Sequence, residues 1–404
     1  MEIRTLAKVA LLIFLYYVIY AFYGGLLNPS PVLGDSFTYH IPISLAILNG
    51  SILNPHNFTT KTFVFMFNPG SSEAINSLLI LLHIPLTLSN VIAVVILTFS
   101  AFFLGLRFKL AYYYALLFAV SISTLTVIDR WINFVNIDIW LAVFFTLALT
   151  LLKEPKKSYR YFFLLGFILG MLVGSKYSAW PFLIVLLIVY GKSLIKSLSL
   201  KRFLVFFLPF SVFGLFWYIR NYLAVGNPVW PICTLSLPCN KLYYTTAYYQ
   251  MWHMTLQYPS IMVNAFFGEY KLWSLSLILP IIILYAKLKR KDKLPHDVLL
   301  LCFIGIVNFL FLAVAPTDRY SWIMVSSFRY SYPMFIPLIL SIFMLASYYK
   351  KEAWLGFFAI ANMFPALTMS YYPKLVLFYI PIAILCFYLL KQHEPKSKTV
   401  KSRS

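Results

Sequence analysis

Long apolar segments, repeated along almost the whole chain, constrain the fold of this sequence more than any other feature. Only 11% of its 404 residues are charged, while 61% are hydrophobic. A helix needs about 20 apolar residues to cross a bilayer. We therefore predict an all-α polytopic membrane protein with about twelve transmembrane helices. The predicted spans are residues 7–27, 89–106, 111–128, 137–152, 161–175, 178–191, 203–219, 273–286, 297–315, 331–348, 353–370 and 373–390.

The positive charges predict how these spans are oriented. The net charge is +21, and most of the 33 Lys and Arg residues fall in alternate connections, such as KLKRKDK at 287–293. Cytoplasmic connections carry the excess of Lys and Arg, so both termini are expected in the cytoplasm. The first span is too long for a removable signal peptide and is interpreted as a retained anchor. The basic balance then reflects topology and contact with membrane lipids, and it indicates no nucleic-acid partner.

Residues 1–390 are predicted to form one transmembrane module, followed by a disordered basic cytoplasmic tail at 391–404. The first outer loop, 28–88, contains Phe37, Ile41 and Leu45 at helical spacing, which predicts an interfacial helix over 36–48. Residues 72–88 are apolar, but counting them as a span would reverse the charge asymmetry, so we place them as a second surface or re-entrant helix. A further long outer loop is expected at 221–272.

Acidic residues at the outer ends of spans are the best candidates for chemistry. Asp35 lies in GDSFTYHIP, at residues 34–42, just beyond the first span, and Asp138 opens a later one. The alternative for Asp35 is simple capping of the 36–48 helix. For Asp138, an acid leading into an apolar run is disfavoured in lipid, which favours a functional role. Asp129 and Arg130 are expected to form an interfacial ion pair.

Four basic residues also lie at predicted outer span ends, on the side that disfavours them. They are Lys176, Arg220, Arg319 and Arg329. Together they indicate an anionic ligand, with a phosphate as the natural partner; the alternative is snorkelling to lipid headgroups. The candidate substrate-binding residues are Tyr39, His40, Glu73 and Tyr177. No glycine-rich phosphate loop occurs, so nothing indicates nucleotide binding.

Two further patterns concern packing and covalent structure. Gly166, Gly170 and Gly174 recur every fourth residue, which predicts close approach of a neighbouring helix. Cys233 and Cys239 share one outer loop and could form a disulfide in an oxidising compartment, whereas the sequence alone leaves the bond undecided.

Several stretches in order resemble the GT-C superfamily of integral-membrane glycosyltransferases, over about residues 1–350. They are GDSFTYHIP, NPGSSEAINSLL, VNIDIWLAVFF, GMLVGSKYSAWP, FWYIRNYLAVGNPVWP and FRYSYP. The chain is most similar to the branch of protein O-mannosyltransferases and aminoarabinose transferase. This resemblance implies a GT-C-like fold, a dolichyl- or other polyprenyl-phosphate-linked sugar donor, and inverting transfer on the extracytoplasmic face of the cell membrane.

The resemblance also implies roles for individual residues. Asp35 would be the general base on an acceptor hydroxyl, with Asp138 as the second acid, and Lys176, Arg220 and Arg329 would lie near the donor phosphate. Arg319 matches the pattern less well. A divalent cation, Mg or Mn, could be held by Asp35 and Asp138, but Ser36 stands where many relatives carry a second adjacent acid, which puts metal dependence in doubt.

The expected function is therefore transfer of a hexose or pentose to a lipid, glycan or protein acceptor. The chemistry of the residues agrees, because a phosphate leaving group needs positive charge and the acceptor hydroxyl needs a base. Two alternatives stay open at this point. One is a transporter of a lipid-linked saccharide or small anion, which usually shows inverted repeats; the other is a scaffold subunit of a membrane assembly.

Overall fold

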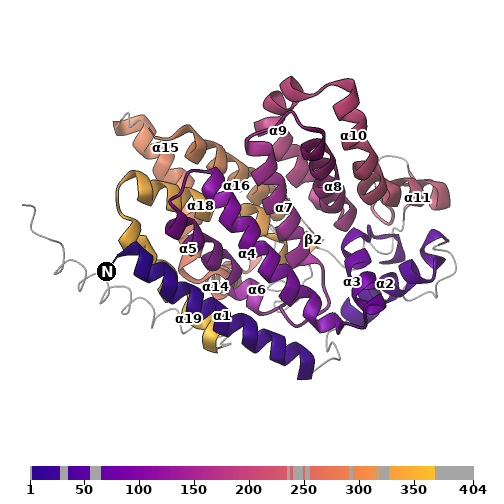
Figure 1. The fold of residues 1–404 in the computed structure, drawn as a ribbon, viewed down its shortest axis with the longest axis horizontal. Helices are drawn as coiled ribbons and strands as arrows, with labels where there is room; N and C mark the ends of the chain where they lie inside the picture. Colours follow the sequence, from indigo (N-terminus) through magenta and orange to yellow (C-terminus); the bar gives the residue numbers. More distant parts are fainter. Residues whose placement is uncertain are drawn as a thin grey trace, which may run out of the picture.

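The protein is a bundle of helices (Figure 1), seen here in a computed structural model. The structure describes residues 2–27, 35–54, 65–233, 237–239, 249–250, 255–290, 294–314, 316–317 and 327–368. Within these ranges, the extended structure is one two-residue antiparallel pair, β1 (Tyr249–Gln250) with β2 (Pro316–Thr317). The all-helical expectation is therefore met in the described part of the chain.

Six helical stretches are long and apolar enough to cross a membrane. They are Ile3–Leu27, Leu86–Arg107, Ala179–Ser197, Leu200–Val225, Pro259–Ile283 and His296–Ala313. Many of their large apolar side chains are exposed on the outside of the bundle, including Leu12, Phe99 and Ile188. Such a surface is stable against lipid tails and unstable against water. The chain is an integral membrane protein.

The described residues of eleven predicted spans lie mostly on helices, but in the described part of the chain only six stretches are long and apolar enough to cross a membrane, so the count of twelve stays a prediction; the last predicted span, 373–390, lies outside the described residues. The principal helices are α1 (Ile3–Leu27), α4 (Ser89–Arg107), α5 (Tyr112–Ser123), α7 (Asp138–Lys153), α8 (Tyr159–Ser175), α9 (Ala179–Ser197), α10 (Leu200–Phe210), α11 (Phe216–Val225), α14 (Pro259–Tyr270), α15 (Leu279–Arg290), α16 (His296–Val314), α18 (Tyr332–Tyr348) and α19 (Glu352–Thr368). Several are shorter than predicted. α5 has 12 residues, against about 20 for a perpendicular span.

The helices form two groups that meet at α7 (Figure 1). In one group α4 packs on α5 and α7, α16 packs on α18, and α1 lies against α5 and α19. In the other, α8 packs on α10 and on the π-helical turn η6 (Ser211–Leu215), which continues into α11. Buried aromatic side chains fill the first group, with Phe343 contacting both Tyr114 and Phe118. Dense packing of this kind holds helices together where lipid removes most of the hydrophobic driving force.

The glycine stripe of α8 does what its spacing predicts. A Cβ added at Gly166 would overlap the backbone carbonyl of Phe206, and one at Gly174 would overlap that of Phe213. Only glycine allows α8 to approach α10 and η6 this closely. The prediction of close helix approach is confirmed, and the contact fixes α11, which carries Arg220.

Residues 28–88, predicted to be the first outer loop, contain short helices at the two places expected from the sequence. A π-helical turn, η1 (Ser36–His40), runs into α2 (Ile41–Leu48), and α3 (Ser71–Leu81) packs on α2 and α8. α3 has 11 residues and a length of about 16 Å, which is too short to cross a bilayer. Farther along, Cys233 and Cys239 form a disulfide bond.

Candidate active site

Asp35 precedes η1 and directs its carboxylate toward the helical core. Its side chain makes no capping hydrogen bond to the helix that follows. Instead, Arg329 Nη2 donates a hydrogen bond of 2.7 Å to Asp35 Oδ2. The Ser36 hydroxyl donates to the Val135 carbonyl, which ties the start of η1 to the segment before α7. Capping therefore does not explain Asp35, whose side chain is still 46% exposed.

Asp138, the first residue of α7, joins two cations from distant parts of the chain. Its carboxylate is 1% exposed. Lys176 Nζ lies 2.9 Å from Oδ1, and Arg329 Nε lies 3.2 Å from Oδ2. Because Arg329 also contacts Asp35, the four side chains form one network. Asp35, Asp138, Lys176 and Arg329 are called the site cluster below.

Aromatic rings hold the two cations of the site cluster in place. Lys176 Nζ lies 3.7 Å from the centre of the Tyr330 ring. The Arg329 guanidinium lies 4.9 Å from the Trp131 ring and 5.3 Å from that of Tyr330. Cation–π attraction in a partly desolvated site restrains both groups without neutralising them. Trp131 and Tyr330 were not singled out from the sequence, although each adjoins a basic residue in it.

The electrostatics of the site cluster favour the charged forms of Asp35, Lys176 and Arg329. Burial would raise the pKa of Asp35, but the charge and hydrogen bond of Arg329 outweigh it and lower the pKa below its usual value. Burial would lower the pKa of Lys176, yet the neighbouring Asp138 raises it. The pKa of Arg329 is likewise raised, because nearby Tyr330, Asp138 and Asp35 outweigh its desolvation. In these three groups, charged neighbours outweigh the effect of burial on the pKa.

Three of the predicted substrate-binding residues lie near the site cluster: Tyr39, which is partly buried, and His40 and Glu73, which are fully buried. Tyr39 is partly buried, with its ring 4.1 Å from that of His40 and 5.0 Å from that of Phe65. His40 Nδ1 lies 2.9 Å from Glu73 Oε1, and both side chains are 1% exposed. His40 and Glu73 therefore fasten η1 to α3 in this conformation, and their role in substrate binding stays a prediction.

Arg220 and Tyr177 belong to a different environment. The hydrogen bonds of Arg220 go to residues outside the site cluster. Its Nε and Nη2 donate to Asn221 Oδ1, and Nη2 also donates to the Met66 carbonyl. Asn221 Nδ2 in turn donates to the Tyr177 hydroxyl, at 2.8 Å. Of the four predicted cations, Lys176 and Arg329 thus share one network, Arg220 has other partners, and Arg319 lies outside the described residues.

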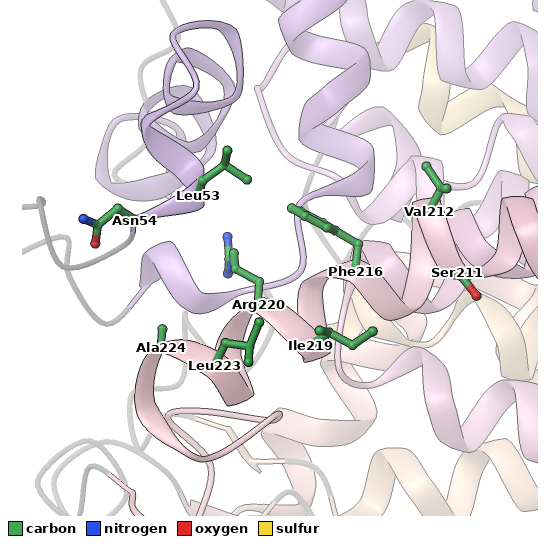
Figure 2. Close-up of a pocket in the computed structure, with 9 residues that line it drawn as sticks. All are labelled: Leu53, Asn54, Ser211, Val212, Phe216, Ile219, Arg220, Leu223 and Ala224. Carbon is green, nitrogen blue, oxygen red and sulfur yellow. The ribbon is translucent and has the colours of Figure 1, made fainter.

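Arg220 lines a pocket of about 540 Å³ on the face of η6 and α11 (Figure 2). Apolar side chains make most of its wall. The lining residues are Leu53, Asn54, Ser211, Val212, Phe216, Ile219, Arg220, Leu223 and Ala224. The volume falls within the range of small-ligand pockets, roughly 300–1,000 Å³. The site cluster contributes no residue to this wall.

Arg130, which was expected to pair with Asp129, forms an ion pair with another helix. Arg130 Nη2 lies 2.6 Å from Glu269 Oε1, on α14. Asp129 is buried at the end of the short helix α6 (Thr126–Asp129), and neither of its carboxylate oxygens has a hydrogen-bond partner. Lys271 is the nearby cation, buried with an unpartnered Nζ. Asp129, Arg130, Glu269 and Lys271 are called the inner cluster below.

The carboxylates of the site cluster do not fit a divalent cation as they are arranged. Asp138 already faces Lys176 with one oxygen and Arg329 with the other, and Asp35 shares Arg329. A metal at these oxygens would stand against two positive charges. No group of three His, Cys, Asp or Glu side chains suited to a metal occurs in the described part of the chain. These residues form an ion-pair network among themselves.

Comparison with known proteins adds no assignment: no family model matches the chain, and no curated protein or solved structure matches it.

Proposed function

We propose that this chain is an integral-membrane glycosyltransferase that moves a sugar from a polyprenyl-phosphate donor to an acceptor hydroxyl. The observation that carries the proposal is the site cluster. It combines one half-exposed carboxylate, Asp35, with two cations, Lys176 and Arg329, that a buried carboxylate holds in place. A base next to fixed positive charge is what transfer from a phosphate-linked sugar requires.

Each group has a distinct part in the proposed reaction. The acceptor hydroxyl gives its proton to Asp35 while its oxygen attacks C1 of the sugar from the side opposite the phosphate. The bond between C1 and the phosphate oxygen breaks, and the phosphate leaves with the electron pair. Lys176 and Arg329 stabilise the negative charge that develops on it, and the anomeric configuration inverts.

The ion pair between Asp35 and Arg329 links donor binding to base activity. Arg329 donates to Asp35 at 2.7 Å, so a phosphate entering the site competes for that guanidinium. When the phosphate takes the hydrogen bond, Asp35 loses its partner and becomes a stronger base. Asp138 stays paired with Lys176 and acts as a positioning residue, because it is buried away from any substrate. No metal takes part in these steps.

The topology and family complete the proposal. Twelve spans with cytoplasmic termini would place the site cluster on the extracytoplasmic face, as in the GT-C glycosyltransferases that the sequence resembles. The positive-inside distribution of Lys and Arg supports this orientation. The acceptor would be a lipid, a glycan or a protein.

The test is sugar transfer by the purified, reconstituted full chain. Proteoliposomes would receive labelled polyprenyl-phosphate-linked hexoses and pentoses, with membrane lipid and protein extracts as acceptors. We expect label in a covalent product of inverted anomeric configuration. Arg329→Gln should abolish this label, whereas Arg107→Gln, which removes only a surface pair with Glu154, should not.

A different outcome would identify the alternative class. If intact donor crosses the liposome bilayer and no covalent product forms with any donor, the protein is a transporter and the proposed transfer is wrong. Retention of full transfer by Arg329→Gln would instead remove the site cluster from the reaction.

A further inference from the structure

Two triplets of the form Asn-X-Ser/Thr, in which X is not proline, occur in the sequence, and both fall in the predicted first outer loop, 28–88. They are Asn-Gly-Ser at residues 49–51 and Asn-Phe-Thr at residues 57–59. Such a triplet accepts an N-linked glycan when it lies on the surface of a segment outside the cytoplasm. Residues 57–59 are outside the described part of the chain, so the first triplet carries the argument.

The first triplet lies in an exposed turn. α2 ends at Leu48, the next two residues, Asn49 and Gly50, are exposed, and the short helix η2 (Ser51–Leu53) follows. Gly50 has a φ of 74°, the left-handed conformation that suits glycine, and a Cβ added there would meet no atom within 4 Å. The turn therefore stands clear of the surrounding helices and leaves room for a glycan.

The side chains of the triplet are already in contact. The Ser51 hydroxyl donates a hydrogen bond of 2.6 Å to Asn49 Oδ1, and the Ser51 backbone N–H donates to the same oxygen at 3.0 Å. Both bonds use the oxygen, and neither uses Nδ2, the atom to which a glycan would be joined. Hydrogen bonds to an amide oxygen polarise the group, which makes its N–H easier to deprotonate.

A second predicted outer loop, 221–272, carries an independent indication of the compartment. It contains the disulfide bond between Cys233 and Cys239. Disulfides form and persist in oxidising compartments, whereas the cytosol keeps thiols reduced. The distribution of Lys and Arg predicts that both loops lie on the side away from the cytoplasm. The charge pattern and the disulfide thus agree on where the turn at residues 49–51 is exposed.

From these observations we infer that Asn49 is an N-glycosylation site. The donor is a lipid-linked oligosaccharide, and a separate transferase of the cell catalyses the step. Asn49 Nδ2 loses a proton to a base of that transferase and forms a bond to C1 of the first sugar. The bond between C1 and the donor's phosphate oxygen breaks, and the phosphate leaves with the electron pair.

The glycan would be remote from the site cluster. Asp35 precedes η1, whereas Asn49 follows the opposite end of α2, a helix of 8 residues and a length of about 12 Å. The inference does not rest on the proposed function, because the chain is here the acceptor of the glycan.

The test is mass spectrometry of the proteolytic peptide that contains Asn49, from the full chain purified from the membranes of cells that naturally produce it. We expect a glycan mass on Asn49. It should be lost in Asn49→Gln and in Ser51→Ala and retained in Ser51→Thr, because threonine keeps the hydroxyl. Asn49 is exposed and Ser51 partly exposed, so these variants should fold.

A matched control tests the compartment. Lys156→Asn creates the same type of triplet with Ser158, between α7 and α8, in a connection that is predicted to be cytoplasmic. Lys156 and Ser158 are both exposed. This triplet should stay unmodified in the same cells.

The outcomes separate cleanly. A glycan on Asn49 that requires the hydroxyl at residue 51, together with no modification of Lys156→Asn at position 156, supports the site. An unmodified Asn49 peptide from the wild type, a glycan that persists in Ser51→Ala, or a glycan at position 156 would overturn the inference.

Discussion

The site cluster and the inner cluster have the same composition, two acids and two cations, yet they differ in every contact. In the site cluster, ion pairs of 2.7–3.2 Å connect all four side chains, and Asp35 is half-exposed. In the inner cluster, an ion pair joins Arg130 to Glu269, while Asp129 and Lys271 are buried with polar side-chain atoms that have no hydrogen-bond partner. Composition alone therefore does not predict how the side chains of such a cluster pair or how exposed they are.

The two clusters also differ in the pKa values of Asp35 and Asp129, the aspartates that lie outside the predicted membrane spans. The pKa of Asp35 is lowered, because Arg329 outweighs the effect of burial. Burial raises the pKa of Asp129 to about 7, since Lys271 and Arg130 offset only part of its desolvation and Glu269 adds to it. At Asp35 the contact with Arg329 outweighs burial, whereas at Asp129 the neighbouring cations do not. A carboxylate that stays ionised and meets solvent can serve as a base.

The largest expected difference between the clusters concerns their lysines. Lys176→Met should reduce transfer by about 10²–10³-fold, the usual cost of removing one preorganised group that stabilises developing charge. Lys271→Met should leave transfer close to wild type, because Lys271 Nζ contacts no member of the site cluster among the described residues. Initial rates at saturating donor would compare them. Equal losses in the two variants would mean that both clusters serve the same reaction.

A smaller effect is expected at Asp138, which positions cations without touching substrate. Asp138→Asn should lower kcat by about tenfold, through misplacement of Lys176 and Arg329, without raising KM for the donor. The KM does not rise, because loss of the competing Asp138 carboxylate leaves both cations free to bind the donor phosphate. A raised KM with unchanged kcat would instead assign Asp138 to substrate binding.

The smallest expected effect is on the pH dependence of folding stability, in which Asp129 and Asp35 should differ. The folded-state pKa of Asp129, about 7, lies above its unfolded value near 3.8. The native state then binds the proton more tightly, so this group's contribution to stability is present at low pH and is lost as pH rises toward 7. Arg130, Glu269 and Lys271 face the same carboxyl.

Thermal unfolding of Asp129→Asn in detergent tests this sign. The wild-type Tm should fall between pH 5 and pH 8, and the variant should show a smaller fall. Asp35→Asn, with the opposite shift in the parent residue, should not reduce the fall. A wild-type Tm that rises over this interval would contradict the buried, protonated state of Asp129.

Local patterns predicted much of the fold. Helical spacing placed a helix over 36–48, and η1 with α2 occupies those residues. The glycine stripe predicted the contact of α8 with α10. Helix lengths were less predictable: α5 ends at Ser123 even though apolar residues continue, because the chain turns at Thr124 and Leu125 before α6.

The sequence predicted site residues where a charged side chain stood at the end of an apolar span. It did not predict side-chain pairs that depend on tertiary packing. Asp35, Asp138, Lys176 and Arg329 each stood at a predicted span end, and the structure brings them together. Arg220 shared that signal but lies in its own pocket, since the position of α11 depends on how α8 and η6 pack. The pairing of Arg130 with Glu269 depends on α14, far along the chain, and no local pattern encodes it.

The most direct test of the central claim, that Asp35 is the base of the site cluster, is single-turnover transfer from pre-bound labelled donor. Asp35→Asn would be compared with the matched inner-cluster variant Asp129→Asn. We predict that both bind donor, that Asp129→Asn transfers sugar at nearly the wild-type rate, and that Asp35→Asn is slower by about 10²–10⁴-fold. A wild-type rate in Asp35→Asn would contradict the claim.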